Sequence, residues 1–318
     1  MDIRSIQADA EGDRLYGRGT TDMKGFLASV LAAADCIDAS RLKRPLHIAF
    51  SYDEEIGCVG VRPLIDVLGA RQFKAAICLV GEPSSMQIAT GHKGKTAARA
   101  MFTGEAGHSS LAPRYVNAIH LACDFVATLR NLQSEVARSG VTDIPYSTIH
   151  AGRISGGVAL NIVADRASVD FEIRNVAGDN VSEFLERLQI AVPSAEIAIL
   201  NAYPGLVTQN DNVVARVRAL VEGASTTKVS FGTEAGLFSE KLNIDTVVIG
   251  PGNMDQGHHR DEYIEHSDIM RCDEMLERLL DRWNSCDCSP PCSAIPTTAP
   301  SEMATFSRRT AGRFARNT

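Results

Sequence analysis

Short runs of apolar residues stand out in the first and last thirds of the chain. Each run is five to eight residues long, which is the usual length of a strand and too short for a typical helix. Apolar runs of this kind are typical of strands buried on both faces of a parallel sheet. The four runs are 46–51, 75–81, 228–232 and 245–252.

Helical periodicity accompanies these runs. Residues 23–37 carry apolar side chains at intervals of three and four, which predicts an amphipathic helix. Thr20 and Thr21 precede this segment as candidate helix caps. The segment that ends in MLERLLDRW, at 275–283, predicts another helix. Strands interleaved with helices indicate an α/β structure with a mostly parallel sheet.

The middle of the chain has a different pattern. Residues 95–106 and 166–175 alternate apolar and polar side chains, as half-exposed antiparallel strands do. The segments 115–132 and 181–192 have helical periodicity. Strands and helices arranged in this way predict an α+β domain at 92–204, inserted into the α/β domain.

The predicted insertion divides the chain into three parts. Residues 1–91 and 205–283 would form one discontinuous α/β domain around the inserted domain. The stretch 284–318 is rich in Pro, Ser and Thr and has no apolar periodicity, so we expect it to be disordered. Three cysteines there, at 286, 288 and 292, suggest a metal site, but no second Cys or His cluster lies nearby to complete four ligands.

Composition excludes several classes of function. The net charge is −7, from 32 basic and 39 acidic residues, and no basic run suggests a nucleic-acid partner. No apolar stretch approaches the roughly 18 residues that span a bilayer. The first residues lack the apolar core of a signal peptide, and most cysteines are scattered in apolar contexts, which favours reduced thiols in the cytoplasm.

Carboxylates and histidines follow the predicted strands. Because ligands of open parallel sheets bind at the carboxyl ends of the strands, we expect these side chains to converge there. Taken singly, each acid is more often a solvated loop residue, but a group of acids and histidines favours a cation such as Zn²⁺. The residues are Asp22, ahead of the first helix, and Asp53, Glu54, Glu55, Glu82, Glu234, His258 and His259.

Five ordered motifs give the chain a resemblance to a known family. They are GRGTTDMKGF at 17–26, SYDEEIGCVG at 51–60, GEPSSM at 81–86, GEAGHSS at 104–110 and GPGNMDQGHHRDEY at 250–263. These segments resemble successive motifs of the M20 metallopeptidase family, over about residues 12–283. The resemblance implies a zinc-peptidase-like catalytic domain with a ferredoxin-like inserted domain that serves as lid and dimerisation module.

The family resemblance also implies roles for the acidic cluster. Asp22 would bridge two metal ions, Glu55 and His258 would complete one metal site, and Glu82 would serve the other. Glu54 would be the general base that takes a proton from the attacking water. Zn²⁺ is the expected metal, with Co²⁺ as the alternative.

Residues of the inserted domain take part in the implied site as well. His108 would cross a dimer interface and stabilise the oxyanion in the partner's active site, so the resemblance implies a homodimer. Asn161 and Arg174 would hold the substrate carboxylate, for which a guanidinium is suited, although a strand-edge salt bridge is the alternative for Arg174. Charge alone suggests that Glu234 meets the ammonium of a basic substrate.

One family motif is missing from the chain. In the family an earlier His-x-Asp supplies the remaining ligand of the second metal, and no His precedes His47 here. The chain therefore resembles a family member that lacks its first elements, and we expect one complete ligand set and one tightly held ion. A non-catalytic dimerisation module is the alternative from a different class.

The motifs are nearest to those of family members that hydrolyse N-acetylornithine to ornithine and acetate, a step of arginine synthesis. The expected activity is therefore metal-dependent hydrolysis of a small N-acyl amino acid. Another N-acyl amino acid hydrolase, such as one that removes succinate from N-succinyl-diaminopimelate, is the alternative within the family.

Overall fold

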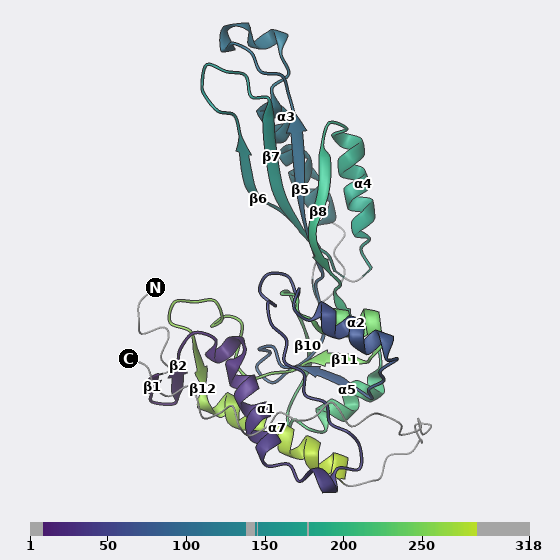
Figure 1. The fold of residues 1–318 in the computed structure, drawn as a ribbon. Coiled ribbons are helices and arrows are strands. Elements are labelled where there is room, and N and C mark those ends of the chain that lie inside the picture. The colour runs from purple at the N-terminus through teal and green to yellow at the C-terminus, as the bar shows by residue number, and fades with distance from the viewer. Residues whose placement is uncertain (1–8, 138–143, 145, 177, 285–318) are drawn as a thin grey trace, which may run out of the picture. The chain divides into compact units, whose positions relative to one another are not determined.

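The computed structural model describes residues 9–137, 144, 146–176 and 178–284 (Figure 1). The described chain up to Asn284 belongs to one compact unit. The predicted disordered tail and its three cysteines lie outside the described residues. The boundaries predicted for the inserted domain, 92–204, therefore remain a prediction, although the elements within them form a sheet of their own.

That sheet is four-stranded and antiparallel, with the order β6-β7-β5-β8. The predicted strands appear as β5 and β7, and alternate side chains of β7 are buried as the pattern requires. The predicted helices appear as α3 and α4, whose buried side chains pack with those of the sheet in one core, where Phe125 lies between Phe102 and Phe171. The element bounds are β5 Lys95–Thr103, α3 Ala118–Val136, β6 Thr148–Gly156, β7 Arg166–Arg174, α4 Val181–Ala191 and β8 Glu196–Tyr203.

A second sheet of the described chain has five short strands and is mixed rather than mostly parallel. β4 pairs parallel with β10 and β3 pairs parallel with β11, whereas β4 pairs antiparallel with both β11 and β9. Three of the predicted apolar runs correspond to β3, β10 and β11, which confirms a mixed α/β fold with parallel strands. The bounds are β3 Cys78–Val80, β4 Ile88–His92, β9 Leu206–Val207, β10 Thr226–Val229 and β11 Thr246–Val248.

The strand predicted at 46–51 is wrong. The structure gives 45–54 an irregular conformation, and among the described residues no strand pairs with it. An apolar run becomes a strand only when a neighbouring backbone accepts and donates its hydrogen bonds. Without one, Phe50 and Tyr52 remain 52% and 65% exposed.

The helices α1 and α7 come from opposite ends of the described chain and pack side by side (Figure 1). α1 begins at Gly25 rather than at Met23, and neither Thr20 nor Thr21 caps it, so that part of the prediction is wrong. The two threonine hydroxyls instead donate to the backbone carbonyls of Gly17 and Tyr263. The bounds are β1 Asp9–Glu11, β2 Arg14–Tyr16, η2 Thr20–Lys24, α1 Gly25–Asp35, β12 Tyr263–Glu265 and α7 His266–Asn284.

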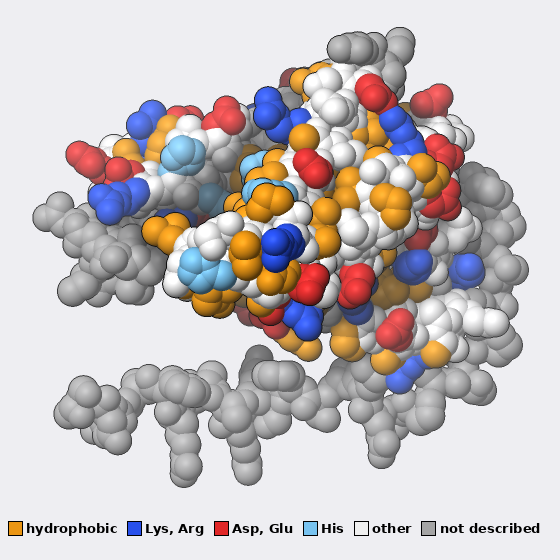
Figure 2. All heavy atoms as spheres, turned by 90° about the horizontal axis from the view of Figure 1, so that it is seen from above, with side chains coloured by type: hydrophobic (Ala, Val, Ile, Leu, Met, Phe, Trp, Pro, Cys, Tyr) orange, Lys and Arg blue, Asp and Glu red, His pale blue; other side chains and the backbone are white. Residues whose placement is uncertain are grey.

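The remaining helices are short. α2 and α6 share a core with the loop that follows Glu55, and α5 lies against β4. None of the described helices is long and apolar enough to cross a membrane. On the face drawn in Figure 2, basic and acidic side chains are interspersed with apolar ones. The bounds are η3 Ala39–Arg41, α2 Arg62–Ala70, η4 Ser109–Arg114, α5 Asp211–Arg218 and α6 Ala235–Leu242.

Candidate metal centre

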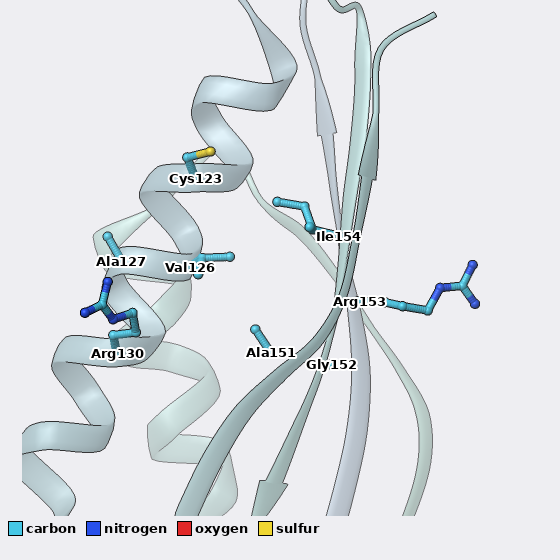
Figure 3. Close-up of a pocket in the computed structure, with 8 residues that line it drawn as sticks. All are labelled: Cys123, Val126, Ala127, Arg130, Ala151, Gly152, Arg153 and Ile154. Atoms are coloured by element: carbon cyan, nitrogen blue, oxygen red, sulfur yellow. The ribbon is translucent and has the colours of Figure 1, made fainter.

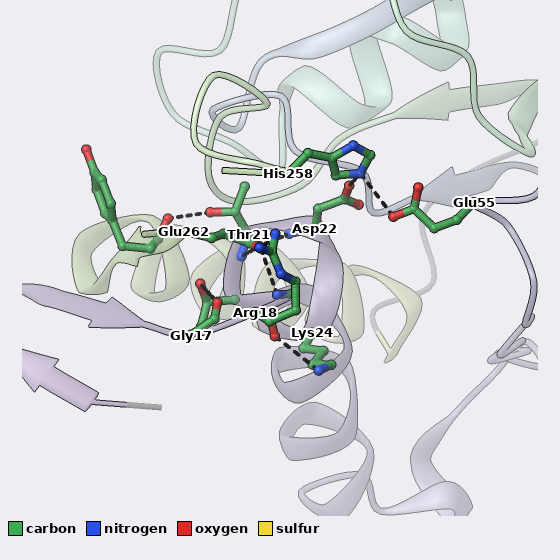
Figure 4. A network of polar contacts seen from close by, with 11 residues as sticks. Gly17, Arg18, Thr21, Asp22, Lys24, Glu55, His258 and Glu262 are labelled. Atoms are coloured by element: carbon green, nitrogen blue, oxygen red, sulfur yellow. Dashed lines mark hydrogen bonds and ion pairs between the residues drawn. The ribbon is translucent and has the colours of Figure 1, made fainter. Parts of the chain in front are cut away.

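Three predicted ligands meet although they are far apart in sequence. Asp22 lies in η2, the turn before α1, Glu55 follows the irregular segment 45–54, and His258 lies in the loop between β11 and β12 (Figure 4). His258 Nε2 is 2.9 Å from Asp22 Oδ2 and 3.0 Å from Glu55 Oε1. The neighbouring His259 has no part in this group among the described residues.

The three donors suit a divalent ion such as zinc. Their ligand atoms lie within 4.8 Å of one another. A tetrahedral Zn²⁺ with bonds of about 2.0–2.2 Å holds its ligand atoms about 3.3–3.6 Å apart, so small shifts would admit the ion. His258 has a positive φ of 60°, a conformation that costs energy for a residue with a side chain and is often found at functional sites.

Charge crowding in the centre also favours a cation. Burial raises the pKa of Asp22, and the charge on Glu55 acts in the same direction. Burial lowers the pKa of His258, but the charge of Glu55 and its hydrogen bond, together with Asp22, outweigh that effect and the net shift is upward. Imidazole and carboxylate groups are the ligand types that zinc prefers, so this cluster suits a bound cation.

Glu82 lies next to Asp22. It follows β3 and is buried. Burial, followed by the charges on Asp22 and Glu54, raises the pKa of Glu82 well above its ordinary value. The hydrogen bond between the two carboxyl groups also raises the pKa of Glu82 and lowers that of Asp22. A buried acid beside a metal ligand is consistent with the role predicted for Glu82, although Glu82 is not one of the three convergent donors.

Glu54 is half-buried beside the three ligands. Burial raises the pKa of Glu54 to about 7, and the charges on Glu55, Glu234 and Asp22 add to the effect, while the Cys58 thiol opposes it by donating to Glu54 Oε1 at 3.4 Å. A carboxyl group with a pKa near neutrality suits a general base.

The next residue to Glu54, Asp53, is exposed and has a positive φ of 53°. It is not one of the convergent donors in the described chain. Asp53 is therefore solvent-exposed, as single loop acids usually are.

Glu234 has an oxygen without a partner. The residue precedes α6, and the Ser51 hydroxyl donates to Glu234 Oε2 at 2.7 Å, whereas the buried Oε1 accepts no hydrogen bond from the described residues. Burial raises the pKa of Glu234. A buried acceptor of this kind is costly unless a donor reaches it, so the geometry suits a ligand with a cationic group.

The residue before Glu234 is fixed by a buried histidine. His92 Nε2 is 3.0 Å from the Thr233 hydroxyl, which also accepts a hydrogen bond from the Ala235 amide. His92 Nδ1 lies 2.9 Å from the Lys93 carbonyl oxygen, so Nδ1 donates and Nε2 accepts. Burial lowers the pKa of His92 to about 4, which keeps the ring neutral at physiological pH.

Arg174 makes the salt bridge that was its alternative role. Its Nε donates to Glu172 at 2.5 Å and its Nη1 donates to the Tyr203 hydroxyl at 3.1 Å, which leaves Nη2 without a partner in the described chain. A second cation, Lys93, lies nearby. Burial lowers the pKa of Lys93, and the positive charge on Arg174 acts in the same direction. Among the described residues no ion pair neutralises Lys93, so the two cations together suit an anionic ligand group.

His108 and Asn161 lie together but are not joined to the acidic cluster. The amide of Ser109 donates to the Asn161 carbonyl at 3.0 Å, and His108 pairs with Ile162 in a β-bridge. Among the described residues, the exposed His108 ring makes hydrogen bonds only with Ser110. The role predicted for His108 across a dimer therefore stays a prediction.

Sequence reasoning missed two residues, Glu262 beside Asp22 and Lys93 near Arg174. Glu262 is buried and accepts four hydrogen bonds around Asp22, but in sequence it is one acid among several charged residues. Lys93 follows a strand as the predicted acids do, and that position is the signal that could have identified it.

Comparisons with known proteins agree with the geometry. The family model described as peptidase family M20/M25/M40 matches residues 4–282. An acetylornithine deacetylase of Myxococcus xanthus is 33% identical over 288 residues, which cover 87% of this chain and 74% of the relative. A Yersinia pseudotuberculosis protein of the same name is 32% identical over 85% of this chain and 71% of its own length.

Solved structures share the fold at lower identity. The aminopeptidase PepT of Bacillus cereus matches with a TM-score of 0.71 at 20% identity, over 88% of this chain and 77% of that chain. An M20 family metallo-carboxypeptidase of Sulfolobus solfataricus matches with a TM-score of 0.69 at 20% identity, over 88% and 80%. The family model and the curated relatives together show that this chain is a hydrolase of peptidase family M20/M25/M40, as its motifs predicted.

Proposed function

We propose that the protein is a metal-dependent amidohydrolase that converts N-acetylornithine to ornithine and acetate, as the names of the relatives suggest. The observation that carries the proposal is the convergence of Asp22, Glu55 and His258 beside Glu54. Zn²⁺ or Co²⁺ would be held by these three ligands, with Glu82 behind them. When bound, the ion would polarise the acyl carbonyl and make water a stronger acid.

The residues of the chain would carry the proton transfers. Glu54 would take a proton from the attacking water and then give a proton to the leaving amine, which one carboxyl group can do in succession. The imidazole of His108 from a second subunit would stabilise the negative oxygen that develops at the carbonyl. Neither step requires groups other than those predicted from the motifs.

Recognition of the amino acid would use the charged groups around the centre. Arg174 and Asn161 would hold the α-carboxylate. The Nη2 of Arg174, which has no partner in the described chain, and the neighbouring Lys93 support an anion there. Glu234 would accept a hydrogen bond from the side-chain ammonium of ornithine. Its Oε1, which has no partner among the residues that the structure describes, supports this role.

A homodimer would form through the inserted domain, residues 92–204. β6 is an edge strand of the four-stranded sheet, so its outer backbone groups are available to a second copy. Beside it, a groove of about 330 Å³ lies between α3 and β6, lined by Cys123, Val126 and Arg130 from the helix and Ala151, Arg153 and Ile154 from the strand (Figure 3). We expect this assembly to work in the cytoplasm.

The proposal is tested by supplying purified protein with zinc and measuring amine release from two substrates. N-acetylornithine should be hydrolysed, N-succinyl-diaminopimelate more slowly, and none after removal of the metal. Faster hydrolysis of the succinyl substrate would replace the proposed substrate but keep the reaction class. Zinc-loaded protein that releases no amine from any N-acyl amino acid would favour a non-catalytic dimerisation module.

A further inference from the structure

Glu262 is a buried carboxylate that gathers hydrogen bonds from the turn that carries Asp22. Its side chain is 2% exposed. Oε1 accepts from the amides of Thr21 at 3.0 Å and Asp22 at 3.1 Å, and Oε2 accepts from the amide of Gly19 at 2.9 Å and from Arg18 Nη1 at 3.1 Å (Figure 4). Both oxygens are therefore fully engaged by donors of one short segment.

The turn from Gly19 to Asp22 cannot satisfy these amides by itself. Gly19 has a left-handed conformation with φ 79°, and Asp22 has φ −118° and ψ 88°, which is not helical. Amides in such a turn point away from the regular bonds of α1 and need acceptors from elsewhere. Hydrogen bonds to an ionised acceptor are shorter and stronger than neutral ones, so one carboxylate can fix the whole turn.

The position of Glu262 links two parts of the centre. It follows His258 by four residues, and it bonds to the amide of Asp22 across 240 positions of sequence. The next residue strengthens the link, because the Tyr263 carbonyl accepts from the Thr21 hydroxyl at 2.6 Å. The loop of one metal ligand thereby holds the backbone of another.

We propose that Glu262 is a positioning residue that orients the Asp22 carboxylate toward His258 and Glu55. It does not touch the ligand atoms and acts through the backbone of Asp22. The inference rests on the proposed metal centre, because only a bound cation makes the direction of the Asp22 carboxylate matter. Groups that orient metal ligands commonly change metal affinity about 10–100-fold when they are altered.

The decisive variant is Glu262→Gln, which keeps the shape but not the charge. Each oxygen of Glu262 accepts two hydrogen bonds. The NH₂ group of glutamine cannot accept, so whichever oxygen it replaces, two of the four hydrogen bonds are lost. Glu265→Gln is the matched control. Glu265 is three residues away, is 47% exposed and pairs with Arg14 at 3.7 Å. Among the described residues, no hydrogen bond or ion pair is seen between its side chain and the Asp22 turn.

The first measurement is hydrogen exchange of the amides of Gly19, Thr21 and Asp22 in the metal-free proteins. Wild-type protein should protect them, Glu262→Gln should exchange them about tenfold faster or more, and Glu265→Gln should match wild type. Unchanged exchange in Glu262→Gln would overturn the inference whether or not the protein binds metal. Hydrogen exchange of the metal-free protein can therefore contradict this inference independently of whether the proposed function is correct.

The second measurement is zinc affinity, determined by competition with a coloured chelator on samples shown to be folded. Glu262→Gln should weaken zinc binding about 10–100-fold, and Glu265→Gln should leave it unchanged. A residue that only stabilised the fold would lower the melting temperature of Glu262→Gln without changing the zinc affinity of its folded fraction. That outcome, or equal weakening in the control, would also overturn the inference.

Discussion

Replacing Glu234 by Gln should separate basic from neutral substrates. The variant keeps the size of the side chain and an oxygen that the Ser51 hydroxyl can reach at the position of Oε2. It removes the negative charge from the buried position where Oε1 has no partner among the described residues. A substrate ammonium would therefore lose a charge-assisted hydrogen bond, and a substrate without an ammonium would lose nothing at this position.

The size of the effect follows from that single bond. A hydrogen bond between charged groups contributes about 1.5–3 kcal/mol. Because about 1.4 kcal/mol corresponds to a tenfold change in rate, the loss of this bond should lower kcat/KM for N-acetylornithine about 10–150-fold. The loss should lie mainly in KM, because the ammonium is remote from the bond that breaks and is held equally before and during the reaction.

The assay compares N-acetylornithine with N-acetylnorvaline, which has the same carbon chain without the terminal amine. Steady-state kinetics of wild-type protein and Glu234→Gln should give a large ratio for the first substrate and about unity for the second. Equal losses for both substrates would refute the reasoning and would assign Glu234 to support of α6 rather than to recognition of the ammonium.

Glu54→Ala should retain zinc but lose turnover by about 10²–10⁴ or more. Glu55→Ala should instead lose zinc affinity first and recover part of its activity with excess zinc. Equal zinc loss in both variants, measured by elemental analysis, would show that the two roles are misassigned. His108→Ala mixed with Glu54→Ala should recover part of the activity after subunit exchange, because one site of the hybrid dimer is intact, and no recovery would mean that each site uses its own His108. His92 is neutral when folded, and its pKa of about 4 lies below the unfolded value of 6.5, so its stabilising contribution is present above about pH 6.5 and is lost as pH falls toward 4. At about 1.4 kcal/mol per pH unit that loss is about 3.5 kcal/mol of unfolding free energy, and urea denaturation of His92→Gln should lack this component of the pH dependence.

The sequence pattern predicted an element correctly where the pattern itself shows which face of the element is buried. The alternation in 166–175 specifies which face is buried, and β7 forms there at the centre of an antiparallel sheet. The apolar run at 46–51 carries no information about whether another strand lies beside it, and that prediction failed. The prediction that Thr20 or Thr21 caps the first helix was wrong for a similar reason. Their hydroxyls donate hydrogen bonds to backbone carbonyls outside that helix.

The candidate site was predictable where residue type and position at the end of an element coincide. Asp22 precedes a helix, and Glu55 and His258 follow apolar runs of the sequence. The structure brings the three together, although the run before Glu55 forms no strand. Glu262 was not predictable, because its importance lies in amides about 240 residues away that carry no mark in the sequence. The role proposed for His108 requires a second subunit, so a single chain does not test it.

The most direct test of the account is the zinc content of the protein after equilibration with zinc and removal of loosely bound metal. We expect about one tightly held zinc per chain, since the described residues contain one group of three convergent donors. Elemental analysis of Asp22→Ala, measured alongside wild type, should find that zinc lost. A wild-type protein without zinc, or an Asp22→Ala variant that keeps it, would contradict the assignment of the metal centre.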